Sequence, residues 1–206
     1  STFKRIFKKS KLLLRSIAFI LIFALLFTSL PMDGIIALAE QIKEHSFTRE
    51  YEAIVLGNLK NDSGTVDAPI GRHATDRKKM CVTEKNSKHA VTHYSVIKQY
   101  GGFAHLKLRL ETGRTHQIRV HMKHLGHPLF NDERYGGDIV LKGTTFSRYR
   151  QFIQHCFDTC TRQALHAKTL GFVHPVTGEQ MSFDSELPTD MKQLVEGWRE
   201  YINTMD

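Results

Sequence analysis

Hydrophobic and polar positions follow regular periods along most of this chain, and these periods predict its secondary structure. In AHLKLRLE (104–111) three leucines share one parity, while a lysine and an arginine occupy the positions between them. A period of two is typical of a strand with one buried face. We therefore predict a half-buried strand here, and further strands in REYEAIVLG (49–57) and HAVTHYSVIKQ (89–99).

The residues after the leucine strand predict a turn and then a short helix. ETG (111–113) is the turn, Thr115 is placed to cap a helix over about 116–125, and Gly126 lies where that helix would end. Three apolar residues at helical spacing should face the core: Ile118, Met122 and Leu125.

The C-terminal third predicts two more helices around a hairpin. A helix is expected over 146–163, two strands around the turn PVTG, and a last helix that begins near Thr189. Strands in hairpins, with helices between and after them, indicate an α+β domain with a mixed, largely antiparallel sheet and flanking helices.

The first 39 residues follow a different pattern. A basic head precedes an unbroken apolar run at 17–27, and Ala37-Leu38-Ala39 has the form of a cleavage site. This layout is typical of a signal peptide, with an uncleaved membrane anchor as the alternative. We therefore divide the chain into 1–39, with membrane contact through 16–32, and a domain at 40–206 that either alternative would place outside the cytoplasm.

Charge changes this picture only locally. The chain has 29 basic and 21 acidic residues, and six of the basic ones but only one acidic one lie in 1–39. The net charge of 40–206 is therefore +3, so a case for nucleic-acid binding depends on local clusters rather than on the total charge.

Metal chemistry is not expected. Cys156 and Cys160 are one helical turn apart, but buried thiols are the simpler interpretation, and three cysteines do not form a disulfide framework. The histidines between 116 and 127 lack the i, i+4 spacing of a helical zinc pair.

The densest polar cluster is TGRTHQIRVH (112–121). It brings Arg114, His116 and Arg119 together at the predicted start of a helix, where free N–H groups favour an anion. A solvated basic face is the alternative.

This string, continued by GHPLFNDERYGG, closely resembles a motif of the RluA-type RNA pseudouridine synthases. REYEAIVLG, DAPIGRHATDRKKM, KHAVTHYSVI, RQALHAKTLGFVHPVTGE and the closing helix follow in the order of that family, from about Glu40 to the C-terminus. The resemblance implies that uridine in rRNA or tRNA is isomerised to pseudouridine, in a base-flipped state and without a cofactor. It also implies a cytoplasmic enzyme, and we expect a monomer.

The resemblance assigns roles to particular residues. Tyr51 matches the tyrosine that lies against the uracil, and Arg119 is similar to the arginine that pairs with the catalytic aspartate. Residues that would shape the pocket are Arg114, His116 and Gln117, and residues that would contact phosphate are Arg72, Arg77, Lys78 and Lys79. Without the resemblance, Tyr51 would be a core residue, Arg119 a surface ion pair and the basic loop a solvated one.

The family's aspartate motif, HRLDxxTSG, does not occur in the sequence. Asp33 precedes Tyr51 too closely and has neither flank of the motif, so it is not the nucleophile. We expect Arg119 to lie unpaired, apolar sheet surface to be exposed, and activity to be impaired or absent. A join between a signal-like start and part of a synthase would explain this. The alternatives are a non-catalytic RNA-binding remnant and an exported or membrane-anchored fusion protein.

Overall fold

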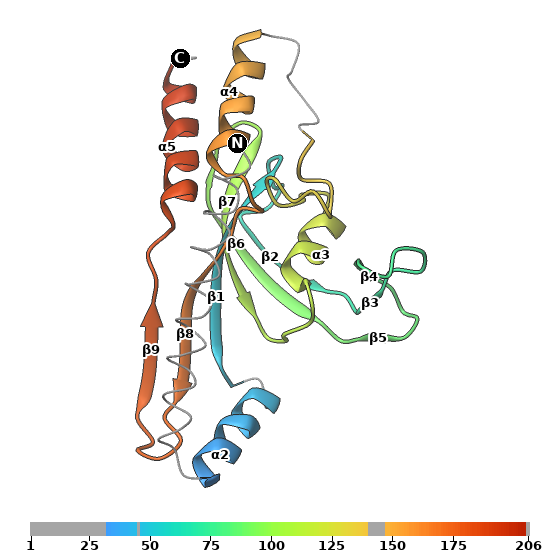
Figure 1. Ribbon diagram of the computed structural model, residues 1–206, viewed down its shortest axis with the longest axis vertical. Coiled ribbons are helices and arrows are strands. Elements are labelled where there is room, and N and C mark those ends of the chain that lie inside the picture. Colours follow the sequence, from blue (N-terminus) through green and yellow to red (C-terminus); the bar gives the residue numbers. More distant parts are fainter. Residues whose placement is uncertain (1–31, 45, 140–146, 205–206) are drawn as a thin grey trace, which may run out of the picture. The chain divides into compact units, whose positions relative to one another are not determined.

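A computed structural model describes residues 32–44, 46–139 and 147–204 of the chain. They fall into two compact units, one with the residues up to 47 and 172–181, the other with 48–171 and 182–206. The elements are α2 (Met32–Lys43), β1 (Thr48–Leu56), β2 (Ser63–Asp67), β3 (Ile70–Arg72), β4 (Met80–Val82), β5 (Ser87–Lys88), β6 (Val91–Gln99), β7 (Phe103–Leu110), α3 (Gln117–His124), α4 (Ser147–Thr159), β8 (Leu165–Val173), β9 (Gln180–Asp184) and α5 (Thr189–Asn203) (Figure 1).

The larger unit is built on a six-stranded sheet with the order β2-β6-β7-β1-β8-β9. The pairs β2–β6, β6–β7, β7–β1 and β1–β8 are all antiparallel. Strand β1 lies next to β7, with Tyr51 opposite Leu108 and Ala53 opposite Leu106. The predicted α+β class with a largely antiparallel sheet and flanking helices is therefore confirmed.

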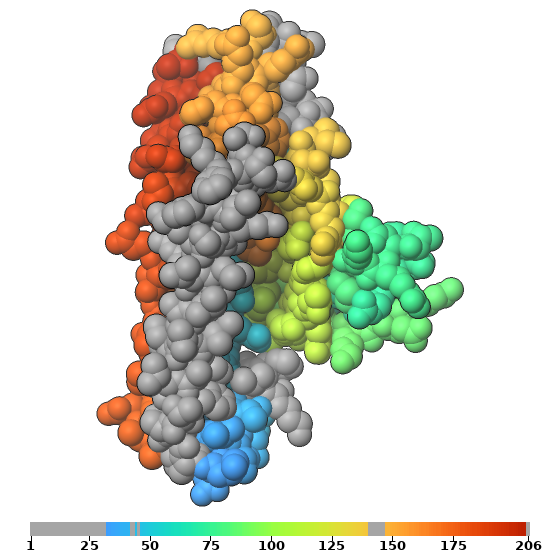
Figure 2. Space-filling view, in the orientation of Figure 1, coloured from blue at the N-terminus to red at the C-terminus, as the bar shows by residue number. Residues whose placement is uncertain are grey.

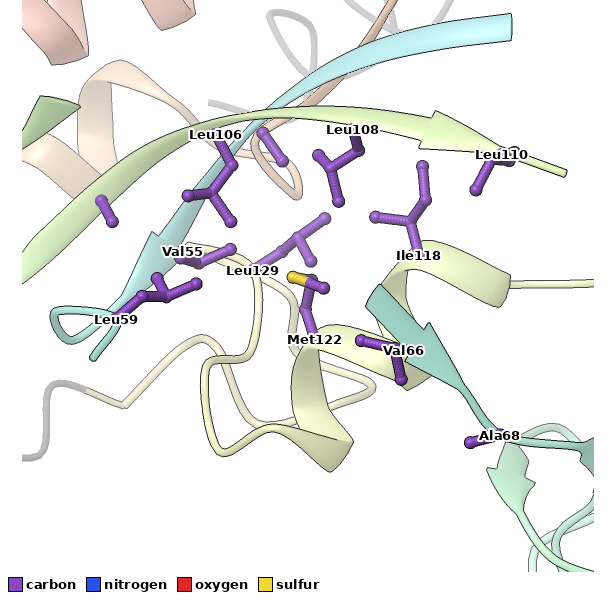
Figure 3. Close-up of a cluster of buried hydrophobic side chains, with 12 residues drawn as sticks. Val55, Leu59, Val66, Ala68, Leu106, Leu108, Leu110, Ile118, Met122 and Leu129 are labelled. Atoms are coloured by element: carbon purple, nitrogen blue, oxygen red, sulfur yellow. The ribbon is translucent and has the colours of Figure 1, made fainter. Parts of the chain in front are cut away.

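One face of this sheet packs against α3. Leu106, Leu108 and Leu110 point to this face, while Lys107 and Arg109 on the same strand are exposed, so the predicted half-buried strand is confirmed. Ile118 and Met122 of α3 meet these leucines (Figure 3). Burial of such side chains contributes about 1.5–3 kcal/mol each, so this contact fixes α3 on the sheet.

The opposite face packs against α4 and α5. Ile54 and Phe103 from the sheet, Cys156 from α4, and Trp198 from α5 belong to one buried cluster. The Phe103 and Trp198 ring centroids are 4.1 Å apart. Both faces are thus buried only where Ile54 and Leu56 of β1 lie beside Phe103 of β7, and this end of the two strands is anchored between the helices.

A second, three-stranded sheet, β4-β3-β5, carries the basic loop. Ile70 from β3 and Val120 from α3 share a small buried cluster with Tyr135. This cluster attaches the small sheet to the side of α3 that faces away from the large sheet.

The start and end of α3 correct two details of the sequence analysis. The N-cap residue is His116 in the left-handed conformation, φ 56°, and not Thr115. Leu125 is 38% exposed and does not face the core, because the helix ends at His124 and Leu125 is its C-cap. Gly126, with φ +86°, ends the turn as expected.

In the smaller unit, α2 is joined to residues of the hairpin tip. The side-chain amide of Gln41 donates to the Val173 carbonyl at 2.8 Å, and the Val173 N–H donates back to Gln41 Oε1 at 3.0 Å. Phe47 stacks on Phe172. The predicted boundary at residues 39 and 40 falls inside α2, and it stays a prediction.

The apolar run at 17–27, and all of 16–32 except Met32, lie outside the described residues, so membrane contact there also stays a prediction. Among the residues that are described, no helix has the length and apolar character to cross a bilayer.

Candidate functional site

Arg119 and Asp132 form a two-point ion pair at the side of α3. Arg119 Nε donates to Asp132 Oδ2 and Arg119 Nη2 donates to Asp132 Oδ1, both at 2.7 Å. The two side chains are 14% and 1% exposed. The expectation that Arg119 lies unpaired is therefore wrong. The physical reason is that the turn after α3 supplies its own carboxylate, which the guanidinium fork fits in two places.

This ion pair raises the pKa of Arg119, with the hydrogen bonds to Asp132 as the main cause. The guanidinium also lies over the Tyr135 ring, 4.8 Å from its centroid. Asp132 uses only the Nε and Nη2 edge. Within the described part of the chain, no hydrogen bond from Arg119 Nη1 is formed, so the second edge of the fork remains for another acceptor.

His116 lies next to this pair and is held by Tyr135. Its Nδ1 is 2.8 Å from the Tyr135 hydroxyl, which also accepts the Met80 N–H at 3.0 Å. Burial lowers the pKa of His116, and Arg119 and Arg134 lower it further. The neutral ring is therefore favoured, and its Nδ1 shares a hydrogen bond with the Tyr135 hydroxyl. The imidazole is thus oriented by the same residue that covers Arg119.

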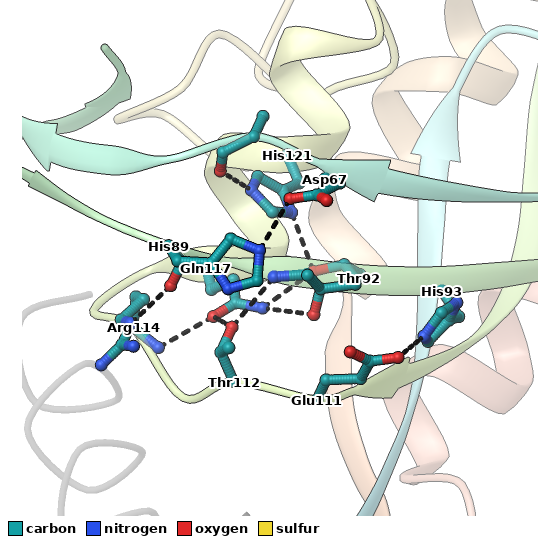
Figure 4. A network of polar contacts seen from close by, with 11 residues as sticks. Asp67, His89, Thr92, His93, Glu111, Thr112, Arg114, Gln117 and His121 are labelled. Atoms are coloured by element: carbon teal, nitrogen blue, oxygen red, sulfur yellow. Dashed lines mark hydrogen bonds and ion pairs between the residues drawn. The ribbon is translucent and has the colours of Figure 1, made fainter. Parts of the chain in front are cut away.

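Gln117 is the centre of a buried hydrogen-bond network (Figure 4). Its amide nitrogen donates to the Val91 carbonyl at 2.9 Å and to Thr92 Oγ1 at 3.0 Å. Its amide oxygen accepts from Thr112 Oγ1 at 2.8 Å and from the Arg114 N–H at 2.9 Å. All four positions of the amide are used, so Gln117 fixes the TGR turn against β6.

His121 extends this network into the core and is fully buried. Its Nδ1 lies 2.8 Å from Thr92 Oγ1, and its Nε2 lies 2.9 Å from the Ala68 carbonyl. The carbonyl can only accept, so Nε2 carries the proton. Burial lowers the pKa of His121, which keeps the ring neutral.

Tyr51 lies in the first half of β1, and Arg114 lies in the turn between β7 and α3. Tyr51 is half-buried, packs on the core next to α3, and has Leu108 and Ala167 as its neighbours in register. The Arg114 Nε donates to the His89 carbonyl at 2.8 Å, so this side chain is bonded to the residue that follows β5.

The predicted phosphate-contacting residues lie on the small sheet and its loop. Arg72, Arg77 and Lys78 are exposed, whereas Lys79 is half-buried with its ammonium 3.7 Å from Asp76. Figure 2 shows this segment at the surface next to α3. Arg134 Nη1 donates to the Lys78 carbonyl at 3.3 Å, so the loop is tied to the turn that carries Asp132.

The sequence analysis did not single out Asp132 and Tyr135, which complete the site. Both belong to NDERYGG, which was quoted for the resemblance but was given no role. A single aspartate in a turn belongs to no periodic pattern and has no characteristic partner at a fixed spacing in the sequence. Its signal appears only when the turn folds back, with Asn131 N–H donating to the Gly137 carbonyl at 2.7 Å.

Cys156 and Cys160 are buried, and Cys81 is half-buried. Burial raises the pKa of Cys156 to about 12. Among the residues that the structure covers, no group of three metal-ligating side chains is present.

Comparisons with known proteins place these features in a family. Residues 27–124 match the family described as RNA pseudouridylate synthase. Over 164 residues the chain is 48% identical to ribosomal large subunit pseudouridine synthase D of Vibrio cholerae. This alignment covers 79% of this chain and 48% of that protein. The chain is therefore similar in sequence to RNA pseudouridylate synthases over most of its length. The resemblance to the RluA type is thereby confirmed, and the matched region begins 13 residues before Glu40.

Other relatives agree. An uncharacterized RNA pseudouridine synthase of Bacillus subtilis, YlyB, is 44% identical over 163 residues, again 79% of this chain and 48% of that protein. The chain thus spans about half the length of these two relatives.

Two solved human structures are also similar. RNA pseudouridylate synthase domain containing 1 has a TM-score of 0.56 and 26% identity, and covers 79% of this chain and 70% of that one. RNA pseudouridylate synthase domain containing 4 has a TM-score of 0.60 over 82% of this chain and 69% of that one, and at 22% identity it supports the fold alone.

Proposed function

We propose that this chain carries part of the uridine site of an RluA-type pseudouridine synthase that acts on rRNA or tRNA, with ribosomal large-subunit RNA as the first substrate to test. The observation that carries the proposal is the guanidinium of Arg119, which is oriented by Asp132 and Tyr135 and keeps one edge of its fork unused. The relative from Vibrio cholerae is named for the large ribosomal subunit.

The proposed mechanism assigns the free edge of Arg119 to a second carboxylate, that of the catalytic aspartate. Asp132 holds the fork in place before that carboxylate arrives, which reduces the entropy lost on pairing. Tyr51 would lie against the uracil ring. His116, neutral and fixed by Tyr135, would line the pocket as a hydrogen-bonding group without adding charge.

The chain by itself is expected to bind RNA and to isomerise uridine poorly or not at all. HRLDxxTSG does not occur in its sequence, and Asp33 is in the first turn of α2 without the flanking residues of that motif. The exposed Arg72, Arg77 and Lys78 would contact phosphates without reading the sequence. RNA binding without chemistry is therefore the second candidate function.

Tritium release from RNA labelled at C5 of uridine tests the first proposal. The 206-residue chain should release no more tritium than the Arg119→Ala variant does. A separate segment that carries the aspartate motif, added in trans, should raise the release of tritium by the chain but not by the variant. Turnover by the chain alone would show that the aspartate motif is dispensable or replaced.

RNA retention at low salt tests the second candidate. The chain should retain a large-subunit RNA fragment, and the triple variant Arg72→Ala, Arg77→Ala, Lys78→Ala should bind it several-fold more weakly, because each lost phosphate contact removes a counterion-release contribution. No retention at low salt would contradict both candidates.

A further inference from the structure

Arg49 is a cation on the α3 side of the large sheet for which the described part of the chain supplies no partner. It lies on β1, two residues before Tyr51, and alternation places both side chains on the same face of the strand. The Cα atoms of such residues are about 7 Å apart. The catalytic roles assigned above do not include Arg49.

The guanidinium of Arg49 is half-buried and makes no hydrogen bond or ion pair within the described residues. Its Nε is buried without any hydrogen-bond partner. A buried N–H of a charged group without an acceptor costs free energy, so a water, an ion or a ligand that accepts from it would be stabilised there.

Gly113 leaves the space that the Arg49 guanidinium occupies. A Cβ atom at residue 113 would lie 2.6 Å from Arg49 Nη1, so the side chain occupies space that only glycine leaves open. Gly113 is the middle residue of the TGR turn, whose next residue, Arg114, hydrogen-bonds to Gln117. Arg49 is therefore held where β1, the end of β7 and the turn before α3 meet.

Among the residues that the structure describes, no carboxylate pairs with Arg49. Glu50, next to it in sequence, points to the other face of the sheet and pairs with Lys107 at 2.9 Å. Glu111 beside the turn is bonded to His93 at 2.5 Å. The acids that could neutralise Arg49 locally are thus already engaged elsewhere.

We propose that Arg49 binds a phosphate of the RNA backbone close to the nucleotide that lies against Tyr51. This inference rests on the proposed function and adds a binding residue to it. A phosphate suits the site because it carries a full charge and several acceptor oxygens, two of which can accept from Nε and one Nη along a single edge of the fork.

The first experiment measures the affinity of the chain for a large-subunit RNA fragment by fluorescence anisotropy over a series of salt concentrations. Arg49→Ala should weaken binding by about three- to tenfold and reduce the slope of log affinity against log salt by about 0.7, the value of one phosphate contact on a single strand. Arg49→Lys should recover part of the affinity. An Arg49→Ala variant that binds RNA as the unchanged chain does would overturn the proposal.

Arg109→Ala is the matched control. Arg109 is exposed on β7, opposite Glu50 in register, and points to the other face of the sheet. Arg109→Ala removes the same positive charge from a position next to that of Arg49 in the sheet, but on the other face and therefore not at the proposed site. Equal losses of RNA affinity in Arg49→Ala and Arg109→Ala would show that only the net charge matters, and would also overturn the proposal.

Gly113→Ala tests the geometry without removing the charge. The added methyl displaces the end of the Arg49 side chain, so this variant should lose about as much RNA affinity as Arg49→Ala. In the Arg49→Ala background it should have no further effect, because the two changes then act on the same contact. Additive losses would contradict the assignment.

Stability and a phosphate titration separate this proposal from the proposed function. Thermal unfolding of Arg49→Ala should occur at the same or a higher temperature, because a buried N–H without an acceptor is removed. A lower temperature together with unchanged RNA affinity would make Arg49 a structural residue. If the unchanged chain binds no RNA, the proposed function fails. The phosphate site is then tested separately, by following the NMR resonances of arginine Nε–H groups while inorganic phosphate is added. A resonance that shifts, and that is missing in Arg49→Ala, supports a phosphate site at Arg49, whereas no shift rejects that site.

Discussion

Arg119 and Asp132 show how one residue pair can both stabilise a turn and prepare a site. Each of the two hydrogen bonds is 2.7 Å long, and Asp132 is almost inaccessible to water. Desolvation makes such a pair costly to form, and it makes the loss of one partner more costly still, because the other charge stays buried. The pair therefore links the stability of the turn to the orientation of Arg119.

Asp132→Ala is expected to lower the free energy of unfolding by about 3–5 kcal/mol, since it leaves Arg119 without its buried partner. Urea unfolding followed by circular dichroism measures this. Glu186→Ala is the control: Glu186 pairs with Lys192 at the surface, with side chains 88% and 45% exposed, and its loss should cost less than about 1 kcal/mol. Equal costs for the two variants would show that the Arg119 pair is not desolvated in solution.

His121 should make stability depend on pH. Its pKa is lowered mainly by burial, and His124 adds to this, while the Ala68 carbonyl and Asp67 oppose it. The unfolded chain therefore takes up a proton at a higher pH than the folded chain. Stability from the neutral ring is complete above the unfolded pKa of about 6.5 and is lost as the pH falls below it.

Urea unfolding between pH 7.5 and 5 tests this expectation. The free energy of unfolding should fall with pH in the unchanged chain, and the fall should be smaller in His121→Gln. The same comparison at high salt excludes a general effect of net charge. An identical pH dependence in both chains would assign the effect to other groups.

At the scale of elements, the turn at 129–137 decides where Asp132 lies. The Gly137 N–H donates to the Asp132 carbonyl at 2.8 Å, and the Tyr135 N–H donates to the same carbonyl at 3.1 Å. A Cβ atom at Gly137 would collide with the Leu129 carbonyl and lie 2.9 Å from the Asp132 nitrogen. Both contacts are to backbone, which cannot move aside as a flexible side chain can.

Gly137→Ala should therefore destabilise the chain by about 3 kcal/mol or more, because the turn must open. The neighbouring Gly136 has φ +82° and nothing within 4 Å of an added Cβ, so Gly136→Ala should cost only the conformational strain of about 1–2 kcal/mol. Urea unfolding of the two variants measures the difference. A smaller cost for Gly137→Ala than for Gly136→Ala would contradict this account of the turn.

Helix α4 offers a second test at this scale, through its thiol. Cys156 is buried between α4 and the sheet, and burial raises its pKa to about 12. A thiol reagent at pH 8 should label Cys81 first, and Cys156 and Cys160 only after unfolding. Mass spectrometry of the labelled chain checks the order. Rapid labelling of Cys156 in the folded chain would mean that α4 detaches from the sheet.

At the scale of the whole molecule, the sequence alone supported most of the fold. The period of two in AHLKLRLE predicted the buried face of β7, and the spacing of Ile118 and Met122 predicted the contact with α3. These predictions succeed because burial acts on each strand and helix through its own period. The cap at Thr115 and the burial of Leu125 were wrong, because helix ends depend on the chain around them.

The candidate site was only partly accessible from the sequence. Tyr51 and Arg119 were assigned roles through a string of motif residues, and these roles stay predictions. Gln117 was expected to shape the pocket, and its four hydrogen bonds fix the turn before α3. Asp132 was missed, and so the prediction of an unpaired Arg119 was wrong. Arg49 was missed as well, because a single arginine on a strand is indistinguishable from a surface charge until its neighbours are known.

The sequence by itself determined the α+β class, the strand faces and the family resemblance, because periodicity and motif order are local properties. Only the tertiary structure decided which charges meet. Asp132 is 13 positions from Arg119 in the sequence, and Gly113, which makes room for Arg49, is 64 positions from it. The free energies of charged groups depend on distance and burial in the folded chain, which no local pattern records.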